Sequence, residues 1–151
     1  MHEDDNHVQK IGVALDESAE AQRAFHSAVE LAKLMRAELT IITVIEHLPA
    51  YIGYVSAIAP DVPLLLENQR RAFYEDMHAL AQKEAAAAGV HLHSKIVEGN
   101  EIEALLHEVR ETLPDLLVVG LRYDPTGLSR FIGGTAHQLA LHTRCDVLGI
   151  R

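Results

Sequence analysis

The residues with the clearest potential for chemistry form one segment near the C-terminal end of the chain, from Gly120 to Thr135. Its glycines stand at positions 120, 127, 133 and 134, where they would let the backbone approach a ligand closely. A helix is expected to begin near Thr135, and the free N–H groups at a helix start favour phosphate. Arg122 and Arg130 would add positive charge. The segment is therefore a candidate phosphate-binding loop; the alternative is a surface loop whose glycines only make turns.

Histidine, cysteine and acidic residues give little support for metal or nucleophilic chemistry. His91 and His93 stand two apart on an expected strand and share a face, but no Cys, Asp or Glu has a recognisable metal spacing with them. Cys145 is expected to be a small buried residue rather than a reactive thiol. Glu101 and Glu103 are expected only to favour the positive end of a helix dipole. Because G-x-S-x-G and Walker A motifs are also missing, we expect no catalytic residue and no metal site.

The elements that would position the candidate loop alternate between β-branched runs and helical stretches. The expected strands are residues 10–15, 39–45, 90–97, 116–119 and 147–150; the expected helices begin after Ser18, span 64–88, and lie around 102–109 and 135–142. This alternation predicts parallel strands joined by right-handed crossovers. The fold class is therefore α/β, with an open, doubly wound, five-stranded parallel sheet.

The expected strand order, 3-2-1-4-5, places a ligand site at the carboxyl ends of the first and fourth strands. The loops that leave those two ends begin at Asp16 and Gly120. Asp16 can either face a ligand or bond nearby backbone amides as a turn residue. Topology and residue types therefore point to the same place.

Two further expectations concern the middle of the chain. Residues 47–63 are expected to form a loop with a short helical piece. In the following helix, one apolar face is expected to be buried; it consists of Leu66, Phe73, Met77, Leu80, Ala81 and Ala88.

The two edges of the sheet lead to a prediction about assembly. The third strand alternates in polarity, as an edge strand does, and the last strand lies at the opposite edge. An open apolar edge favours pairing with a second copy. We expect a homodimer through Val147 to Arg151.

Composition limits the classes of function. The 151 residues fit one domain, expected at 9–151 after a disordered acidic tail at 1–8. The net charge of −9 argues against binding to DNA, and the chain has no apolar run near 18 residues that would favour a membrane. The first residues lack the apolar core of a signal peptide, and a single cysteine suits a reducing compartment. We expect a cytoplasmic protein.

Several segments resemble the universal stress protein family. Residues 13–20 are similar to the family's first strand and turn, whose pattern is V-A-x-D-x-S. Residues 116–120, 127–130, 133–136 and 145–148 are similar to its C-terminal half. The resemblance covers residues 10–151 and implies a flavodoxin-like, adenine-nucleotide-hydrolase-like fold, a role in stress response and a homodimer.

ATP-binding members of that family carry a G-x2-G-x9-G-(S/T) fingerprint. Aligned without gaps, Gly120 and Gly133 match its first and third glycines, whereas Tyr123 and Gly134 stand at the second glycine and the hydroxyl position. One extra residue in the loop makes the last pair Gly134-Thr135 and restores the hydroxyl. Tyr123 departs from the fingerprint in both alignments. A glycine at this position would let the ligand lie against bare backbone, whereas a tyrosine adds a large ring.

The resemblance also implies which residues would contact a nucleotide. The positions that meet adenine and ribose correspond to Ala14, Leu15, Asp16 and Val44. The ribose and phosphate segment corresponds to Gly120, Arg122, Gly133, Gly134 and Thr135, with Arg130 as a candidate at the phosphate rim. ATP or another adenine nucleotide is the implied ligand, with Mg²⁺ if the ligand is ATP.

Three hypotheses remain open at this point. The first is a stress-response regulatory protein that binds an adenine nucleotide, with at most slow hydrolysis. The second is a family member that does not bind nucleotide and acts through dimerisation and protein partners, which Tyr123 favours. The third is a small α/β enzyme that uses the same cleft.

Overall fold

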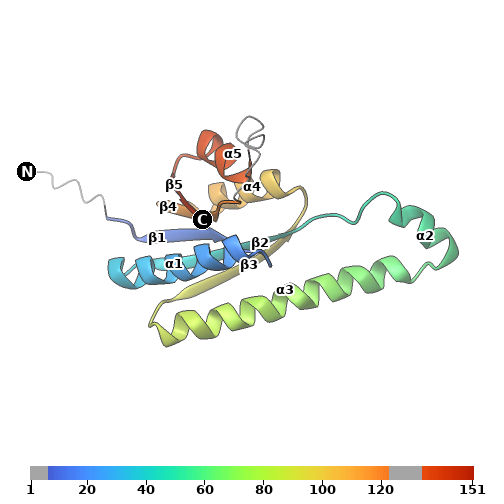
Figure 1. Cartoon of the computed structure of the whole chain (residues 1–151), viewed down its shortest axis with the longest axis horizontal. Helices are drawn as coiled ribbons and strands as arrows, with labels where there is room; N and C mark the ends of the chain where they lie inside the picture. The colour runs from blue at the N-terminus through green and yellow to red at the C-terminus, as the bar shows by residue number, and fades with distance from the viewer. Residues whose placement is uncertain (1–6, 123–133) are drawn as a thin grey trace, which may run out of the picture.

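Five parallel strands form a single sheet in the order β3-β2-β1-β4-β5 (Figure 1). The strands are β1 Lys10–Ala14, β2 Glu38–Ile45, β3 Leu92–Glu98, β4 Leu116–Gly120 and β5 Asp146–Ile150. The computed structural model describes residues 7–122 and 134–151. The predicted sheet and its strand order are confirmed, whereas the predicted tail lies almost wholly outside the described residues.

Within the part of the chain that the structure describes, five helices connect or flank these strands. They are α1 Ala19–Met35, α2 Ile52–Ile58, α3 Val62–Ala87, α4 Glu101–Thr112 and α5 Thr135–His142. Ser18 caps α1 as expected, since its hydroxyl oxygen accepts a hydrogen bond from the Ala21 N–H at 3.2 Å. The short helical piece is α2. Helix α3 begins two residues before the predicted start, because Pro63 suits the first turn of a helix.

Two apolar clusters lie on opposite faces of the sheet. On one face, α1 and α3 cover residues of β1 and β2, with Phe25 and Ile41 among the fully buried side chains. On the other face, α4 and α5 cover residues of β2 and β4 around Leu105, Leu117 and Leu139. This is the doubly wound arrangement, with each helix layer burying one side of the sheet.

The predicted buried face of α3 is partly wrong. The side chains that α3 buries are Tyr74, His78, Ala81 and Ala85, whereas Phe73 and Leu80 are exposed. Two of these buried residues, Tyr74 and His78, have polar groups that form hydrogen bonds with other side chains. A hydrophobicity pattern therefore does not predict that they are buried. The consequence is that α3 carries apolar side chains that the chain itself leaves uncovered.

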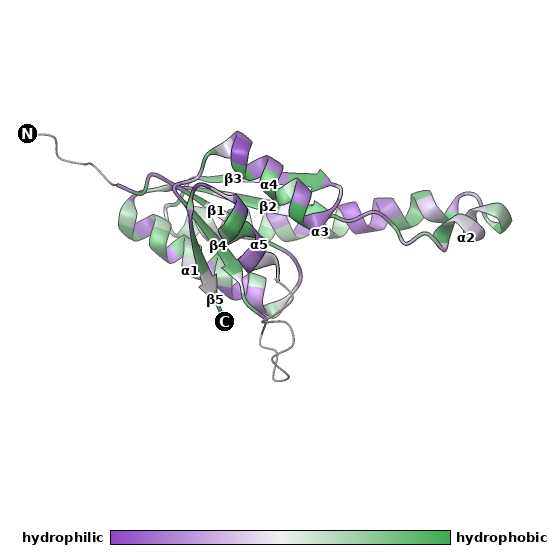
Figure 2. Ribbon diagram, turned by 90° about the horizontal axis from the view of Figure 1, so that it is seen from above, coloured by the Kyte–Doolittle hydropathy of each residue, from purple (hydrophilic) through white to green (hydrophobic). Residues whose placement is uncertain are grey.

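Helix α2 and the first part of α3 extend beyond the sheet, as both views show (Figures 1 and 2). The remaining elements surround the sheet and hold the strand ends in fixed register, with Val13 opposite both Ile41 and Val118. No helix within residues 7–122 and 134–151 is long and apolar enough to cross a membrane.

Candidate functional site: a cleft at the strand ends

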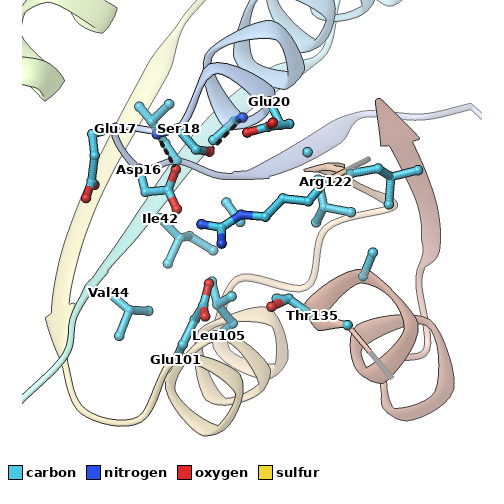
Figure 3. A pocket seen from close by; sticks show the side chains of 18 of the residues that line it. Asp16, Glu17, Ser18, Glu20, Ile42, Val44, Glu101, Leu105, Arg122 and Thr135 are labelled. Carbon is cyan, nitrogen blue, oxygen red and sulfur yellow. Dashed lines mark hydrogen bonds between the residues drawn. The ribbon is translucent and has the colours of Figure 1, made fainter. Parts of the chain in front are cut away.

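A cavity of about 640 Å³ opens at the carboxyl ends of β1, β2 and β4 (Figure 3). The starts of α1, α4 and α5 form its walls. Here the sheet topology reverses, since β1 is paired with β2 on one side and with β4 on the other. The cavity therefore lies where open α/β sheets bind ligands.

Most of the residues proposed from the sequence line this one cavity. They are Ala14, Leu15, Asp16, Val44, Gly120, Arg122, Gly134 and Thr135. Gly133 and Arg130 lie outside the described residues, and so does Tyr123. Thr135 begins α5 as predicted, and Gly134 is its N-cap residue.

Asp16 has a local structural role and also faces the cavity. One carboxylate oxygen accepts a hydrogen bond from the Ser18 N–H at 2.8 Å, which fixes the turn between β1 and α1. The same carboxylate lines the cavity (Figure 3). The turn interpretation is therefore confirmed without excluding contact with a ligand.

Gly120 is required by packing within the protein. A Cβ atom at this position would lie 2.5 Å from the carbonyl carbon of Glu20 and 2.7 Å from the backbone nitrogen of Ala21. The end of β4 thus packs directly against the backbone of α1. This contact accounts for the glycine whether or not a ligand is bound.

Several cavity residues were not predicted as site residues. Glu46 follows β2, Arg70 and Tyr74 come from α3, Glu101 begins α4 and His137 lies in the first turn of α5. Glu101 was expected only to favour the helix dipole, but the structure turns its side chain into the cavity (Figure 3). The available signal was its place directly after the loop that leaves β3, at the same edge of the sheet as Asp16.

The cavity carries more negative than positive charge. Among its described lining residues are five carboxylates and two guanidinium groups: Asp16, Glu17, Glu20, Glu46 and Glu101, with Arg70 and Arg122. Burial raises the pKa of Glu101, and the nearby charges of Glu46 and Asp16 raise it further, whereas Arg122 lowers it. Figure 3 shows the Arg122 side chain reaching into the cavity, between the carboxylates of Asp16 and Glu101 in that view.

Tyr74 joins α3 to the loop after β1. Its hydroxyl donates a hydrogen bond to Glu17 Oε2 at 2.9 Å. Burial raises the pKa of Tyr74 to about 12, and the bond to Glu17 adds to the shift. The phenol therefore stays protonated and keeps its donor role at physiological pH.

Within residues 7–122 and 134–151, no three His, Cys, Asp or Glu side chains lie close enough together to hold a metal ion. The rings of His91 and His93 lie 4.6 Å apart, edge to face, and His93 Nε2 lies 3.6 Å from Glu38 Oε2. Cys145 is half-buried beside the α4–α5 cluster, less buried than predicted.

Comparisons with known proteins agree with the fold and with the sequence segments. The family model for the universal stress protein family matches residues 7–151. Universal stress protein YxiE of Bacillus subtilis is 28% identical over 146 residues, covering 94% of this chain and 98% of the relative.

Two solved structures extend the comparison to three dimensions. Universal stress protein UspA from Lactobacillus plantarum is 25% identical, with a TM-score of 0.76, covering 95% of this chain and 98% of that one. A universal stress protein in complex with cAMP is 28% identical, with a TM-score of 0.66, covering 95% and 97%. The chain belongs to the universal stress protein family.

Proposed function

We propose that the cleft binds an adenine nucleotide and that the protein uses this ligand as a signal of cellular state in a stress response. The observation that carries the proposal is a convergence of side chains on one cavity of about 640 Å³. They come from the loops after β1 and β4, from β2 and from the start of α5: Leu15, Asp16, Arg122, Val44 and Thr135. Their chemistry suits the parts of a nucleotide. Apolar strand ends fit a base, a carboxylate fits ribose hydroxyls, and an arginine with a helix start fits phosphate.

A relative supports the ligand class. The family member whose structure contains cAMP is 28% identical over nearly the whole chain. In this chain Leu15 and Val44 would contact the base and Asp16 the ribose. Arg122, Gly134 and Thr135 would lie along the phosphate. If the ligand is ATP, Mg²⁺ would offset part of the negative charge that the phosphates bring beside the cleft carboxylates.

The role we propose is regulatory rather than catalytic. The cleft side chains of the described residues offer carboxylates, guanidinium groups, hydroxyls and the imidazole of His137. A bound nucleotide would fill the cavity and thereby change the surface that the protein presents. Hydrolysis, where it occurs at all, would be slow.

The test begins with the purified full-length chain. Denaturing extraction followed by chromatography should release an adenine nucleotide, and ATP, ADP, AMP or cAMP should raise the melting temperature. Asp16→Asn is the informative variant, because it retains an oxygen to accept the Ser18 N–H but removes the charge. It should lose most of the shift, whereas Asp76→Asn, at an exposed position of α3, should not. No bound species and no shift at millimolar concentrations would overturn the proposal.

A homodimer through β5 is a second, separate proposal. β5 is an edge strand, and Leu148 on it is partly exposed. Leu148→Lys should halve the mass of the assembly in light scattering, because a charge at an edge disfavours strand pairing. A wild-type monomer at micromolar concentrations would contradict this assembly. A wild-type monomer would also remove the support for the second hypothesis, in which the protein acts through dimerisation and does not bind nucleotide.

A further inference from the structure

Helix α2 and the chain around it form a projection that the body of the protein does not cover. We call residues 48–66 the arm; it comprises α2, the turns on either side of it and the start of α3. α2 buries none of its residues, and it packs mainly against α3. In both Figure 1 and Figure 2 this end of the molecule lies well beyond the sheet.

The arm exposes large apolar side chains at its tip. The exposed fractions are 63% for Tyr51, 81% for Tyr54, 88% for Ile58, 60% for Leu64 and 56% for Leu65. At about 200 Å² for a large side chain, they present roughly 700 Å² of mostly apolar surface. Monomeric proteins rarely expose a contiguous patch larger than a few hundred Å². Apolar exposure of this size is typical of a surface that contacts a partner.

The charge of the arm restricts the occupant. Asp61 is the single charged residue between positions 48 and 66, in a chain with a net charge of −9. An anionic membrane surface or a nucleic acid would require Lys and Arg here. A second copy of this chain offers an equally uncharged apolar surface.

The length and position of the arm also suit a second copy. One side of a standard protein interface buries about 800 Å² and uses roughly 20 residues. The arm has 19 residues, and its exposed apolar side chains supply most of the roughly 800 Å² that one side of such an interface buries. Helix α3 has 26 residues and is about 39 Å long. If two copies touch at the tips of their arms, their acidic bodies lie at opposite ends of the assembly. The distance between the bodies then exceeds the screening length of about 8 Å, so their charges repel each other little.

We propose that the arm is a self-association surface: two copies pair arm to arm and cover each other's Tyr54, Ile58 and Leu65. This interface is distinct from the sheet edge at β5 and does not depend on nucleotide. Where both interfaces form, the assembly is a tetramer or a longer chain of dimers. Where only the arm-to-arm interface forms, the assembly is a dimer.

The first measurement is light scattering after size exclusion, over micromolar concentrations. The double variant Tyr54→Ser with Ile58→Ser should halve the mass of the assembly or reduce it further. Both side chains are more than four-fifths exposed, so the fold should be retained. The matched control is Leu34→Ser with Leu113→Ser, two exposed leucines outside the arm, and it should retain the wild-type mass.

The second measurement identifies the contact itself. In a Cys145→Ala background, Ile58→Cys and Tyr54→Cys should each form covalent dimers under mild oxidation, whereas Leu34→Cys should not. Equal masses for the wild type and the arm double variant would overturn the proposal. So would a failure of both arm cysteines to cross-link, which would place the arm against another surface or another partner.

Discussion

The side chains of Thr43 and His78 are joined inside the protein by a hydrogen bond of 2.6 Å. The Thr43 hydroxyl donates its proton to the carbonyl oxygen of Leu15, at 2.7 Å, so it must accept from His78 Nε2. His78 Nδ1 is then the acceptor for the Ser94 hydroxyl. One neutral imidazole thereby ties α3 to β2, to β3 and, through Thr43, to the Leu15 position in the cleft.

This arrangement predicts a loss of stability in mild acid. Burial lowers the pKa of His78 from 6.5 to about 4. Between those values the unfolded chain binds a proton that the folded chain does not, so the free energy of unfolding decreases as pH falls from 6.5 towards 4. The contribution is roughly 3 kcal/mol in total and vanishes above pH 6.5. Urea denaturation at pH 7.0 and pH 4.5 measures it.

His78→Gln is the control for that prediction. A glutamine can still donate to Thr43 but does not titrate. The variant should therefore lose less stability than the wild type between the two pH values, whatever its stability at pH 7. An equal loss in both proteins would show that other groups cause the acid sensitivity.

Gly120→Ala should destabilise the fold even without ligand. The new Cβ would lie 2.5–2.8 Å from backbone and side-chain atoms of Glu20 and Ala21, so β4 and α1 would have to move apart. Overpacking of this kind costs about 1–3 kcal/mol. Gly134→Ala is the matched control in the same cleft, because a Cβ there has nothing within 4 Å. Similar unfolding free energies for the two variants would refute the packing argument.

The topology could be predicted from sequence because parallel α/β sheets follow from alternating strands and helices. The strand-end residues of the cleft could be predicted for the same reason, since the ends of neighbouring strands meet. Arg70 and Tyr74 could not, because their entry into the cavity depends on how far α3 extends past the sheet. The misplaced face of α3 has a related cause. Phe73 is apolar and exposed, whereas His78 is polar and buried, with hydrogen bonds to Thr43 and Ser94 that satisfy both of its ring nitrogens.

Arg122→Gln should weaken the binding of an anionic nucleotide. The guanidinium group reaches into a cavity whose other described charges are mostly carboxylates. Removing it should raise the Kd for AMP by roughly tenfold, about 1.4 kcal/mol. Arg110→Gln, an exposed position on α4, serves as the control and should leave the Kd unchanged. Isothermal titration measures both, and an unchanged Kd in Arg122→Gln would place the phosphate elsewhere.

Glu101→Gln should have the opposite effect and strengthen the binding of AMP. Glu101 lies in the cavity near Asp16 and Glu46, whose charges, together with burial, raise its pKa. Replacing it with an uncharged amide removes repulsion of the phosphate without removing volume. The Kd should fall by roughly three- to tenfold.

The pH dependence of binding distinguishes this electrostatic effect from a change in packing. As pH falls through the pKa of Glu101, the wild-type carboxyl gains a proton and ceases to repel the ligand. Measured with cAMP, whose phosphodiester keeps a single negative charge over this range, the ratio of the wild-type Kd to the Glu101→Gln Kd should therefore fall towards one as pH is lowered from 8 to 5. Glu103→Gln, two residues further along α4 and exposed, should match the wild type at every pH. A constant ratio of the two Kd values would mean that Glu101 acts through shape rather than charge.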